Sequence, residues 1–173
     1  EQLATGTGSV GVLAQIIQST CDPGDEVVYA WRSFEAYPIV VALAGARSVQ
    51  VPLDADARHD LDAMAAAVTD RTRLLIVCTP NNPTGPSVRA DELRAFLRSL
   101  PEDLLVVLDE AYFEYNQAAD TPVATEVITR YPNVVALRTF SKAYGLAGLR
   151  VGYLLGSPAT VEELERRRPP FSV

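Results

Sequence analysis

Short runs of Val, Leu and Ile alternate with longer amphipathic stretches along this chain. The alternation predicts parallel strands joined by helices, since a helix carries the chain back to the start of the next parallel strand. The apolar runs do not alternate strictly with polar residues, as they would in a sheet with one face in water. We therefore expect the α/β class, with a mostly parallel sheet that helices cover on both faces in three α/β/α layers.

The length suits one such domain, because 173 residues, of which 48% are hydrophobic, suffice to bury a full core. We expect a single domain over residues 1–173, without repeats or an internal linker. Strands are predicted at residues 26–30, 48–53, 74–79, 104–110, 133–139 and 151–156. Helices are predicted at residues 9–20, 34–44, 61–68, 90–100, 125–130 and 159–168.

Charge and cysteine content exclude several classes of protein. The 15 Lys and Arg against 22 Asp and Glu give a formal net charge of −7, which repels a nucleic-acid backbone. The apolar runs are much shorter than the roughly 20 residues of a membrane span. Cys21 and Cys78 are far apart and His59 is the only histidine, so neither a disulfide framework nor a metal site is expected. We expect a cytoplasmic protein in which Cys78 is a small buried apolar residue.

The ends of the chain predict a piece of a longer protein, since it begins EQLATGTGS without a Met and stops at PPFSV. Any site that residues beyond these limits complete is not visible in this sequence. The basic run RRRPP at 166–170 follows three glutamates on the same predicted helix. Cations near the negative pole of a helix indicate a solvated helix end rather than a nucleic-acid patch.

Ligands of parallel sheets gather at the carboxyl ends of the strands, so polar residues that follow the apolar runs are the first site candidates. The candidate segments are GTGSVG at 6–11, TPNNPTG at 79–85, DEAY at 109–112 and TFSKAYGLAGLR at 139–150. GTGSVG has the GxGxxG spacing, in which backbone N–H groups at a helix start bind a phosphate. However, no strand is recognised before it, and a tight turn explains its glycines equally well. Thr7 and Ser9 add hydroxyls, although Ser9 also fits a simple N-cap.

Lys142 is the only lysine of the chain and follows a predicted strand, next to Ser141. We expect it to be desolvated there, which favours the neutral amine that Schiff-base chemistry needs. Arg150, further along the same segment, presents a planar guanidinium suited to a phosphate. Taken one at a time, the two residues also fit an exposed lysine and a surface ion pair.

Asp109 and Glu110 close the apolar run LLVVLDE. An acidic strand end holds magnesium in nucleotide hydrolases, but no GxxxxGK[ST] loop accompanies this one. Two alternatives stay open for Asp109: a functional carboxylate, and a simple cap of the next element.

Taken together, TPNNPTG, LDEAYFEY and RTFSKAYGLAGLRVGY, in this order and spacing, resemble the large domain of fold-type I pyridoxal-phosphate aminotransferases. The resemblance covers essentially the whole chain and is strongest to the histidinol-phosphate aminotransferases and their aromatic amino acid branch. WRSFEAYP and GTGSV are more similar to the aromatic branch. The resemblance implies pyridoxal 5′-phosphate as cofactor, an amino donor and a 2-oxo acid as small-molecule partners, and a homodimer.

The resemblance also implies a role for each matching residue. Lys142 would bond the cofactor aldehyde and later move a proton between the substrate Cα and the cofactor. Asp109 would pair with the ring nitrogen, while Asn82 and Tyr112 would hydrogen-bond the phenolic oxygen of the ring. Phe34 would stack on the ring, although it also fits a core aromatic, as Asn82 fits a turn and Tyr112 a half-buried surface position. The phosphate would be held by Thr7, Gly8, Ser9, Ser141 and Arg150.

Three functional hypotheses follow. The first is amino-group transfer from an aromatic amino acid or histidinol phosphate to a 2-oxo acid such as 2-oxoglutarate. The second is a cofactor-binding fragment without catalysis, because the arginine by which this family grips the substrate carboxylate cannot be assigned here. The third is a Rossmann-type NAD(P) oxidoreductase built on GTGSVG, which leaves NPTG and SKAYGLAGLR unexplained.

Overall fold

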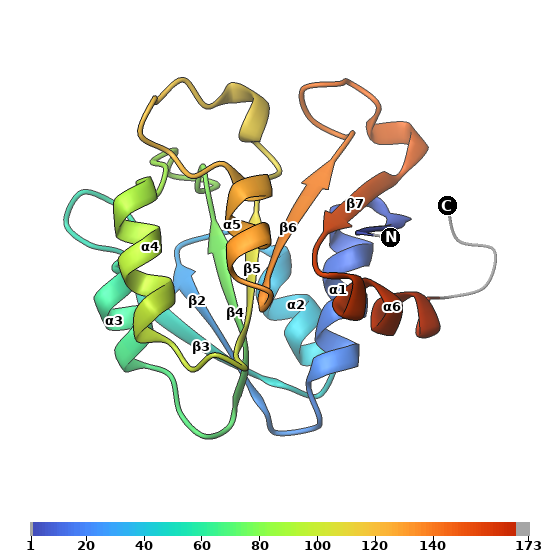
Figure 1. The fold of residues 1–173 in the computed structure, drawn as a ribbon, viewed down its shortest axis with the longest axis horizontal. Coiled ribbons are helices and arrows are strands. Elements are labelled where there is room, and N and C mark those ends of the chain that lie inside the picture. Colours follow the sequence, from blue (N-terminus) through green and yellow to red (C-terminus); the bar gives the residue numbers. More distant parts are fainter. Residues whose placement is uncertain (1, 169–173) are drawn as a thin grey trace.

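A seven-stranded sheet forms the middle layer of the computed structural model, which describes residues 2–168 (Figure 1). Its strands are β1 Leu3–Thr7, β2 Glu26–Trp31, β3 Arg47–Pro52, β4 Thr72–Cys78, β5 Leu105–Asp109, β6 Val134–Thr139 and β7 Val151–Leu155. They lie in the order β1-β7-β6-β5-β4-β2-β3. β7 is antiparallel to β1 and β6, and the other neighbours are parallel. The predicted fold class, with a mostly parallel sheet, is therefore confirmed.

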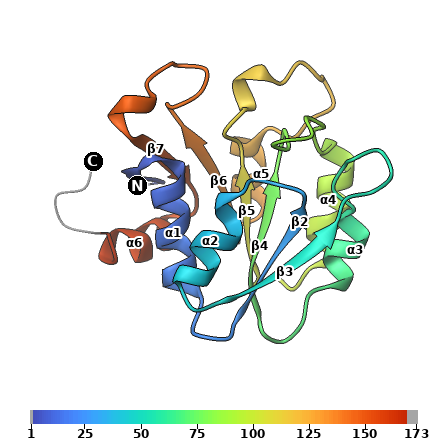
Figure 2. The same ribbon diagram turned by 180° about the vertical axis from the view of Figure 1, so that it is seen from behind.

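Helices cover both faces of this sheet (Figure 2). One face carries α1 Gly8–Thr20, α2 Ala36–Leu43 and α6 Pro158–Arg166, and the other carries α3 Leu61–Ala66, α4 Ala90–Ser99 and α5 Ala124–Arg130. In α1, the side chains of Val12, Ile16 and Ile17 follow the helical repeat and are fully buried against the sheet. Burial of each such side chain contributes about 1.5–3 kcal/mol to stability. The two apolar cores, one on each side of the sheet, therefore fix the three layers.

The sequence did not predict strand β1. Its segment LATGT has no apolar run, and it is held by antiparallel pairing with β7, in which Gly6 lies opposite Gly152. A Cβ on Gly152 would overlap the backbone of Ser9, so a glycine here lets the first turn of α1 approach the strand closely. The pairing ties the beginning of the chain to the last strand of the sheet.

The predicted solvated helix end is confirmed at α6. Arg166 pairs with Glu162 at 2.6 Å, and Arg167 pairs with Glu163 at 3.0 Å, between guanidinium nitrogen and carboxylate oxygen. Ion pairs of such exposed side chains contribute about 0–1 kcal/mol each, so they solubilise the helix more than they stabilise it. The rest of the predicted basic run and the chain end, residues 169–173, lie outside the described residues.

Every helix within residues 2–168 is too short or too polar to cross a membrane. Cys21 and Cys78 carry free thiols and are buried, as expected for Cys78. Burial raises the pKa of the Cys78 thiol to about 12, so this residue behaves as a small apolar side chain near neutral pH.

Candidate active site

A cavity of about 250 Å³ opens where β4, β5 and β6 end and α1 begins. Eight residues that the sequence singled out lie in its wall: Ser9, Phe34, Asn82, Asp109, Tyr112, Ser141, Lys142 and Arg150. The wall is completed by Val10, Cys78, Ala111, Thr139 and Ala147. Segments from five distant parts of the chain therefore meet at one edge of the sheet, as the rule for parallel sheets predicts.

Asp109 is the last residue of β5 and one of the most enclosed groups of this cavity, since only 4% of its surface is exposed. Its Oδ2 accepts a hydrogen bond of 2.6 Å from the hydroxyl of Tyr37, and its Oδ1 accepts one of 3.2 Å from the backbone N–H of Ala111. Burial raises the pKa of this carboxyl above its ordinary value, while the two donors and the charge of Lys142 oppose the rise. Asp109 is thus a functional-site candidate rather than only a helix cap.

Glu110, the next residue, does not line the cavity. Its carboxylate pairs with the Nε of Arg138 at 2.8 Å, and both side chains are largely buried. Burial raises the pKa of the Glu110 carboxyl, and the guanidinium of Arg138 opposes the rise. The guanidinium also lies 4.1 Å from the ring centroid of Phe113, so this pair fixes the chain that follows β5.

The predicted desolvation of Lys142 is wrong for this chain. Lys142 and residues 143–150 are exposed, because no element among residues 2–168 packs over the loop between β6 and β7. The amine still belongs to the cavity: Nζ lies 5.2 Å from the ring centroid of Tyr112, and its charge acts on Asp109. Lys142, the only lysine of the chain, therefore shares one cavity with the buried Asp109.

Part of the cavity wall brings several hydrogen-bond donors together. Nη1 of Arg150 donates to Oγ of Ser141 at 3.3 Å and to the backbone oxygen of Ala147 at 2.9 Å. Ser9 stands in the first turn of α1, whose N-terminus has neither an acidic residue nor a side-chain cap. Uncapped N–H groups at a helix start, two hydroxyls and a guanidinium are donors that suit a phosphate.

Thr7 and Gly8 do not line this cavity. Thr7 is exposed, and the N–H of Gly8 already donates to the backbone oxygen of Arg150 at 2.8 Å. Gly8 has a φ of +72°, and a Cβ there would lie 2.5 Å from Nη2 of Arg150. The glycine therefore allows the close approach of Arg150, and Ser9 is the first residue of this segment that lines the cavity.

The GxGxxG motif does follow a strand, β1, although the sequence did not reveal it. A dinucleotide-binding unit places its first two strands side by side and parallel. Here β1 pairs with β7, and β2 lies near the far edge of the sheet next to β3. The topology therefore contradicts the Rossmann-type interpretation of GTGSVG.

Asn82, Tyr112 and Phe34 form the side walls. Asn82 lies in the loop after β4, and Tyr112 directly precedes the short 3-10 helix η1 Phe113–Tyr115; both are half-buried. Phe34 precedes α2, so the helix predicted from residue 34 begins later, at Ala36. Its ring contacts Tyr37 edge to face, with 5.6 Å between the centroids. Phe34 thus belongs both to the cavity wall and to the aromatic cluster beneath it.

Sequence reasoning missed the buried support of these walls, above all Asn81. Its Oδ1 accepts from the hydroxyl of Ser33 at 2.8 Å, and its Nδ2 donates to the backbone oxygen of Arg32 at 3.1 Å and to Oγ1 of Thr84 at 2.7 Å. Asn81 therefore clamps the loop of Asn82 to the segment that leads into Phe34. The signal was the Asn pair in TPNNPTG, of which only the second residue was singled out.

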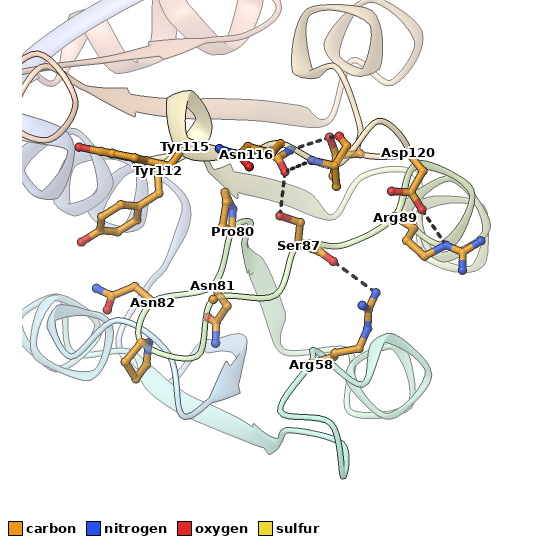
Figure 3. Close-up of a pocket in the computed structure, with 15 residues that line it drawn as sticks. Arg58, Pro80, Asn81, Asn82, Ser87, Arg89, Tyr112, Tyr115, Asn116 and Asp120 are labelled. Carbon is orange, nitrogen blue, oxygen red and sulfur yellow. Dashed lines mark hydrogen bonds and ion pairs between the residues drawn. The ribbon is translucent and has the colours of Figure 1, made fainter.

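A larger cavity of about 780 Å³ adjoins the first and shares Asn82 and Tyr112 with it (Figure 3). Its two arginines already have partners. Arg58 donates to the backbone oxygen of Ser87 at 3.2 Å, and Arg89 pairs with Asp120 at 3.4 Å. The second cavity is thus a polar space beside the candidate site rather than an anion site of its own.

Comparison with known proteins gives matches over essentially the whole chain. The family described as Aminotransferase class I and II matches residues 1–173. Aromatic amino acid aminotransferases of Streptomyces coelicolor and Rhodococcus opacus match 99% of this chain, with sequence identities of 61% and 58%. The matched regions cover 48% and 47% of those proteins, so the chain spans about half the length of the curated relatives.

Solved structures share the fold. A histidinol-phosphate aminotransferase from Sinorhizobium meliloti, in complex with pyridoxal-5′-phosphate, has a TM-score of 0.90 and 39% identity over 96% of this chain and 45% of its own. A mutant of the aspartate aminotransferase of Thermus thermophilus has a TM-score of 0.87 and 27% identity over 95% of this chain and 46% of its own. The sheet and its covering helices are therefore those of the fold-type I proteins that the sequence resembles.

Proposed function

Because the chain belongs to the class I and II aminotransferases, we propose that it carries the cofactor site of an enzyme that transfers the amino group of an aromatic amino acid to a 2-oxo acid such as 2-oxoglutarate. The aromatic donor is favoured over histidinol phosphate by the names and the identity of the curated relatives. The observation that carries the proposal is the meeting of Lys142, Asp109 and Arg150 in one cavity.

The donor set of this cavity fits pyridoxal 5′-phosphate. Ser9, Ser141 and Arg150 offer hydroxyls and a guanidinium to a phosphate at one end, where a Cβ on Gly8 would displace the arginine. At the other end, the buried carboxylate of Asp109 suits a protonated ring nitrogen. The carboxylate of Asp109, the amine of Lys142 and the donors around Arg150 thus match the ring nitrogen, the aldehyde and the phosphate of this cofactor.

The roles of the side chains follow from this fit. When bound, pyridoxal 5′-phosphate supplies a ring that withdraws electrons from the substrate Cα. Lys142 would hold the cofactor covalently through Nζ, and once the substrate amine has taken its place, its amine would move the proton from the substrate Cα to the cofactor. Asp109 keeps the ring nitrogen protonated by its negative charge.

The walls of the cavity orient the ring. The amide of Asn82 and the hydroxyl of Tyr112 would hydrogen-bond its phenolic oxygen, and Phe34 would pack on its face. Each of these side chains is half-buried and leaves part of its surface open to the cavity.

We further propose that residues 1–173 form the cofactor-binding large domain of the protein, which acts as a cytoplasmic homodimer. The length of the relatives supports the first point, since the chain matches about half of each. Ile39 and Leu43, on the outer face of α2, are 60% and 76% exposed, as expected of side chains that a second subunit covers. The free thiols of both cysteines fit a reducing compartment.

The proposed cofactor site is tested by adding pyridoxal 5′-phosphate to the purified protein. We expect a visible absorbance band of the bound cofactor and, after borohydride reduction, a mass increase on the peptide that contains Lys142. Lys142→Arg is the matched control, because it keeps the positive charge but loses the primary amine; both signals should disappear. Tight binding of a nicotinamide dinucleotide without either signal would overturn the proposal.

The substrate is tested on the same holoprotein. Phenylalanine or tyrosine should convert the visible band to the absorbance of the aminated cofactor, and 2-oxoglutarate should restore it. If histidinol phosphate converts the band and the aromatic amino acids do not, the proposed donor is wrong and histidinol phosphate is the substrate. A stable band that no donor changes would support the alternative of a cofactor-binding fragment without catalysis.

A further inference from the structure

Tyr37 is a buried polar residue that the proposed chemistry does not use. It lies in the first turn of α2, is 0% exposed, and packs edge-on against Phe34 and Tyr29, with centroid distances of 5.6 and 5.5 Å. A tyrosine enclosed by other rings loses water at its hydroxyl, so the hydroxyl needs a partner within the protein. The position of that partner indicates what Tyr37 does.

The partner is the carboxylate of Asp109. The Tyr37 hydroxyl donates to Oδ2 over 2.6 Å, a short distance typical of a hydrogen bond between a hydroxyl and a charged oxygen. Burial and the charge of Asp109 raise the pKa of the Tyr37 phenol well above its ordinary value. The hydroxyl therefore keeps its proton over the range in which enzymes work and acts as a fixed donor.

The environment of Asp109 requires such a donor. Three titratable side chains face the carboxylate from different elements: Tyr37 of α2, Cys78 of β4, and Lys142 after β6. The thiol of Cys78 is neutral near pH 7, and Lys142 is exposed to water, which screens its charge. Among the influences that oppose the rise in the Asp109 pKa, the hydroxyl of Tyr37 is the largest.

One buried side chain thus contacts two parts of the cavity wall. Its hydroxyl binds Asp109, and its ring supports Phe34, which also lines the cavity. We propose that Tyr37 is a positioning residue of the reaction, whose hydroxyl holds Asp109 charged and aimed into the cofactor cavity. This inference rests on the proposed function, in which Asp109 pairs with the ring nitrogen of the cofactor.

The direct test is the titration of Asp109 in the protein without cofactor. The protein is labelled with ¹³C at the aspartate carboxyl groups, the resonance of Asp109 reports its protonation, and the Asp109→Asn variant assigns that resonance. Tyr37→Phe keeps the ring and removes the donor, so the midpoint of the Asp109 titration should rise by about one pH unit or more. Tyr29→Phe is the matched control: Tyr29 is equally buried in the same cluster, but its hydroxyl accepts from Gln50 at 3.2 Å. In Tyr29→Phe, the midpoint of the Asp109 titration should match that of the wild type. An unchanged midpoint in Tyr37→Phe would overturn the inference.

A second measurement needs no tyrosine variant and applies even if Tyr37→Phe does not fold. A hydroxyl proton in a hydrogen bond whose two oxygens lie 2.6 Å apart should give a downfield, slowly exchanging proton resonance in the wild type. Asp109→Asn should move this resonance upfield by removing the charge. A wild-type spectrum without it would contradict the proposed donor.

The holoprotein gives the functional readout. Tyr37→Phe should lower kcat about tenfold and leave the KM for the amino donor within about twofold, because it acts on the ring nitrogen and not on substrate binding. Tyr29→Phe should change neither value. If the wild type binds no pyridoxal 5′-phosphate, the proposed function fails, while the titration of Asp109 still decides whether Tyr37 controls its charge.

Discussion

Asp109 shows how a single residue can be held in an environment that opposes its own charge. The end of β5 buries it beside an apolar core, which raises the pKa of its carboxyl. The short hydrogen bond from Tyr37 and the longer one from the N–H of Ala111 satisfy both carboxylate oxygens. A carboxylate fixed in this way is ready to stabilise a positive charge that arrives with a ligand, without first rearranging.

Asp109→Asn is expected to separate cofactor attachment from chemistry. The amide keeps the shape of the side chain but not its charge, so Lys142 should still bind pyridoxal 5′-phosphate covalently. Removal of the substrate Cα proton should slow on the order of 10²-fold, since a preorganised charge is lost. Single-turnover absorbance measurements after addition of the amino donor report this rate, and a rate equal to the wild type would contradict the role given to Asp109.

A prediction at Gly8 tests the donors around Arg150. Gly8→Ala places a Cβ 2.5 Å from Nη2 of Arg150 on a backbone with a φ of +72°, so the guanidinium must move. We expect the affinity for pyridoxal 5′-phosphate to fall about tenfold or more, which corresponds to about 1.4 kcal/mol. Gly11→Ala is the control in the same motif, because its Cβ would meet only Thr7 at 3.4 Å. Equal affinities of the two variants in a fluorescence titration would argue against the close approach of Arg150.

At the level of elements, the predictable part of the structure was the part with strong apolar runs. Strands such as β4 and β5 were found from sequence because their side chains are buried on both faces. β1 was missed because its residues, LATGT, form a strand only through pairing with β7, far along the chain. The exposure of Lys142 was mispredicted for a related reason, since the sequence shows which residues adjoin it but not what covers them.

The contact between α1 and β7 gives a prediction at this scale. Gly152→Ala would force a Cβ into the backbone of Ser9 and Gly8, so α1 must shift away from the sheet. We expect a loss of about 3 kcal/mol of unfolding free energy, measured by urea denaturation. Gly148→Ala, whose Cβ would meet no atom within 4 Å, is the control and should change stability by about 0.5 kcal/mol or less. Similar losses in both variants would contradict the packing described for β7.

For the molecule as a whole, sequence reasoning found the layers and most of the cavity wall but not the residues behind that wall. The motifs marked Lys142, Asp109 and Arg150 because they follow strands, and parallel strands end at one edge. Tyr37 and Asn81 were not marked, because their importance depends on hydrogen bonds across 72 and 48 positions of the chain. Such long-range partners have no local pattern.

The stability of the whole fold should depend on the carboxylate of Glu26, the first residue of β2. Glu26 accepts hydrogen bonds from Thr69 at 2.6 Å and Arg71 at 2.9 Å, which lower the pKa of its buried carboxyl below the ordinary value. Because the pKa of Glu26 is lower in the folded state, its charge stabilises the fold at pH values above its unfolded-state pKa, near 4.5. This contribution is lost as the pH falls through the lower pKa of the folded state. Glu26→Gln should therefore be less stable than the wild type at pH 7, with a difference that shrinks below about pH 4.5.

Thermal unfolding between pH 3 and 7 measures this difference. Glu35→Gln is the control, because the Glu35 side chain is 76% exposed and pairs with Arg32 on the surface. The Glu35→Gln variant keeps Glu26, so its stability should differ from that of the wild type by only a small amount. A Glu26→Gln variant whose deficit stays constant down to pH 3 would contradict the assignment.

The pairing of β1 with β7 also has a consequence for the birth of the protein. A ribosome makes residues 3–7 well before residues 151–155, the strand that pairs with them. Until then, residues 3–7 lack their partner strand in the sheet, and the N–H of Gly8 lacks the carbonyl of Arg150 to which it donates. The end of the cavity where Ser9, Ser141 and Arg150 meet therefore cannot assemble until β7 has been made and has paired with β1.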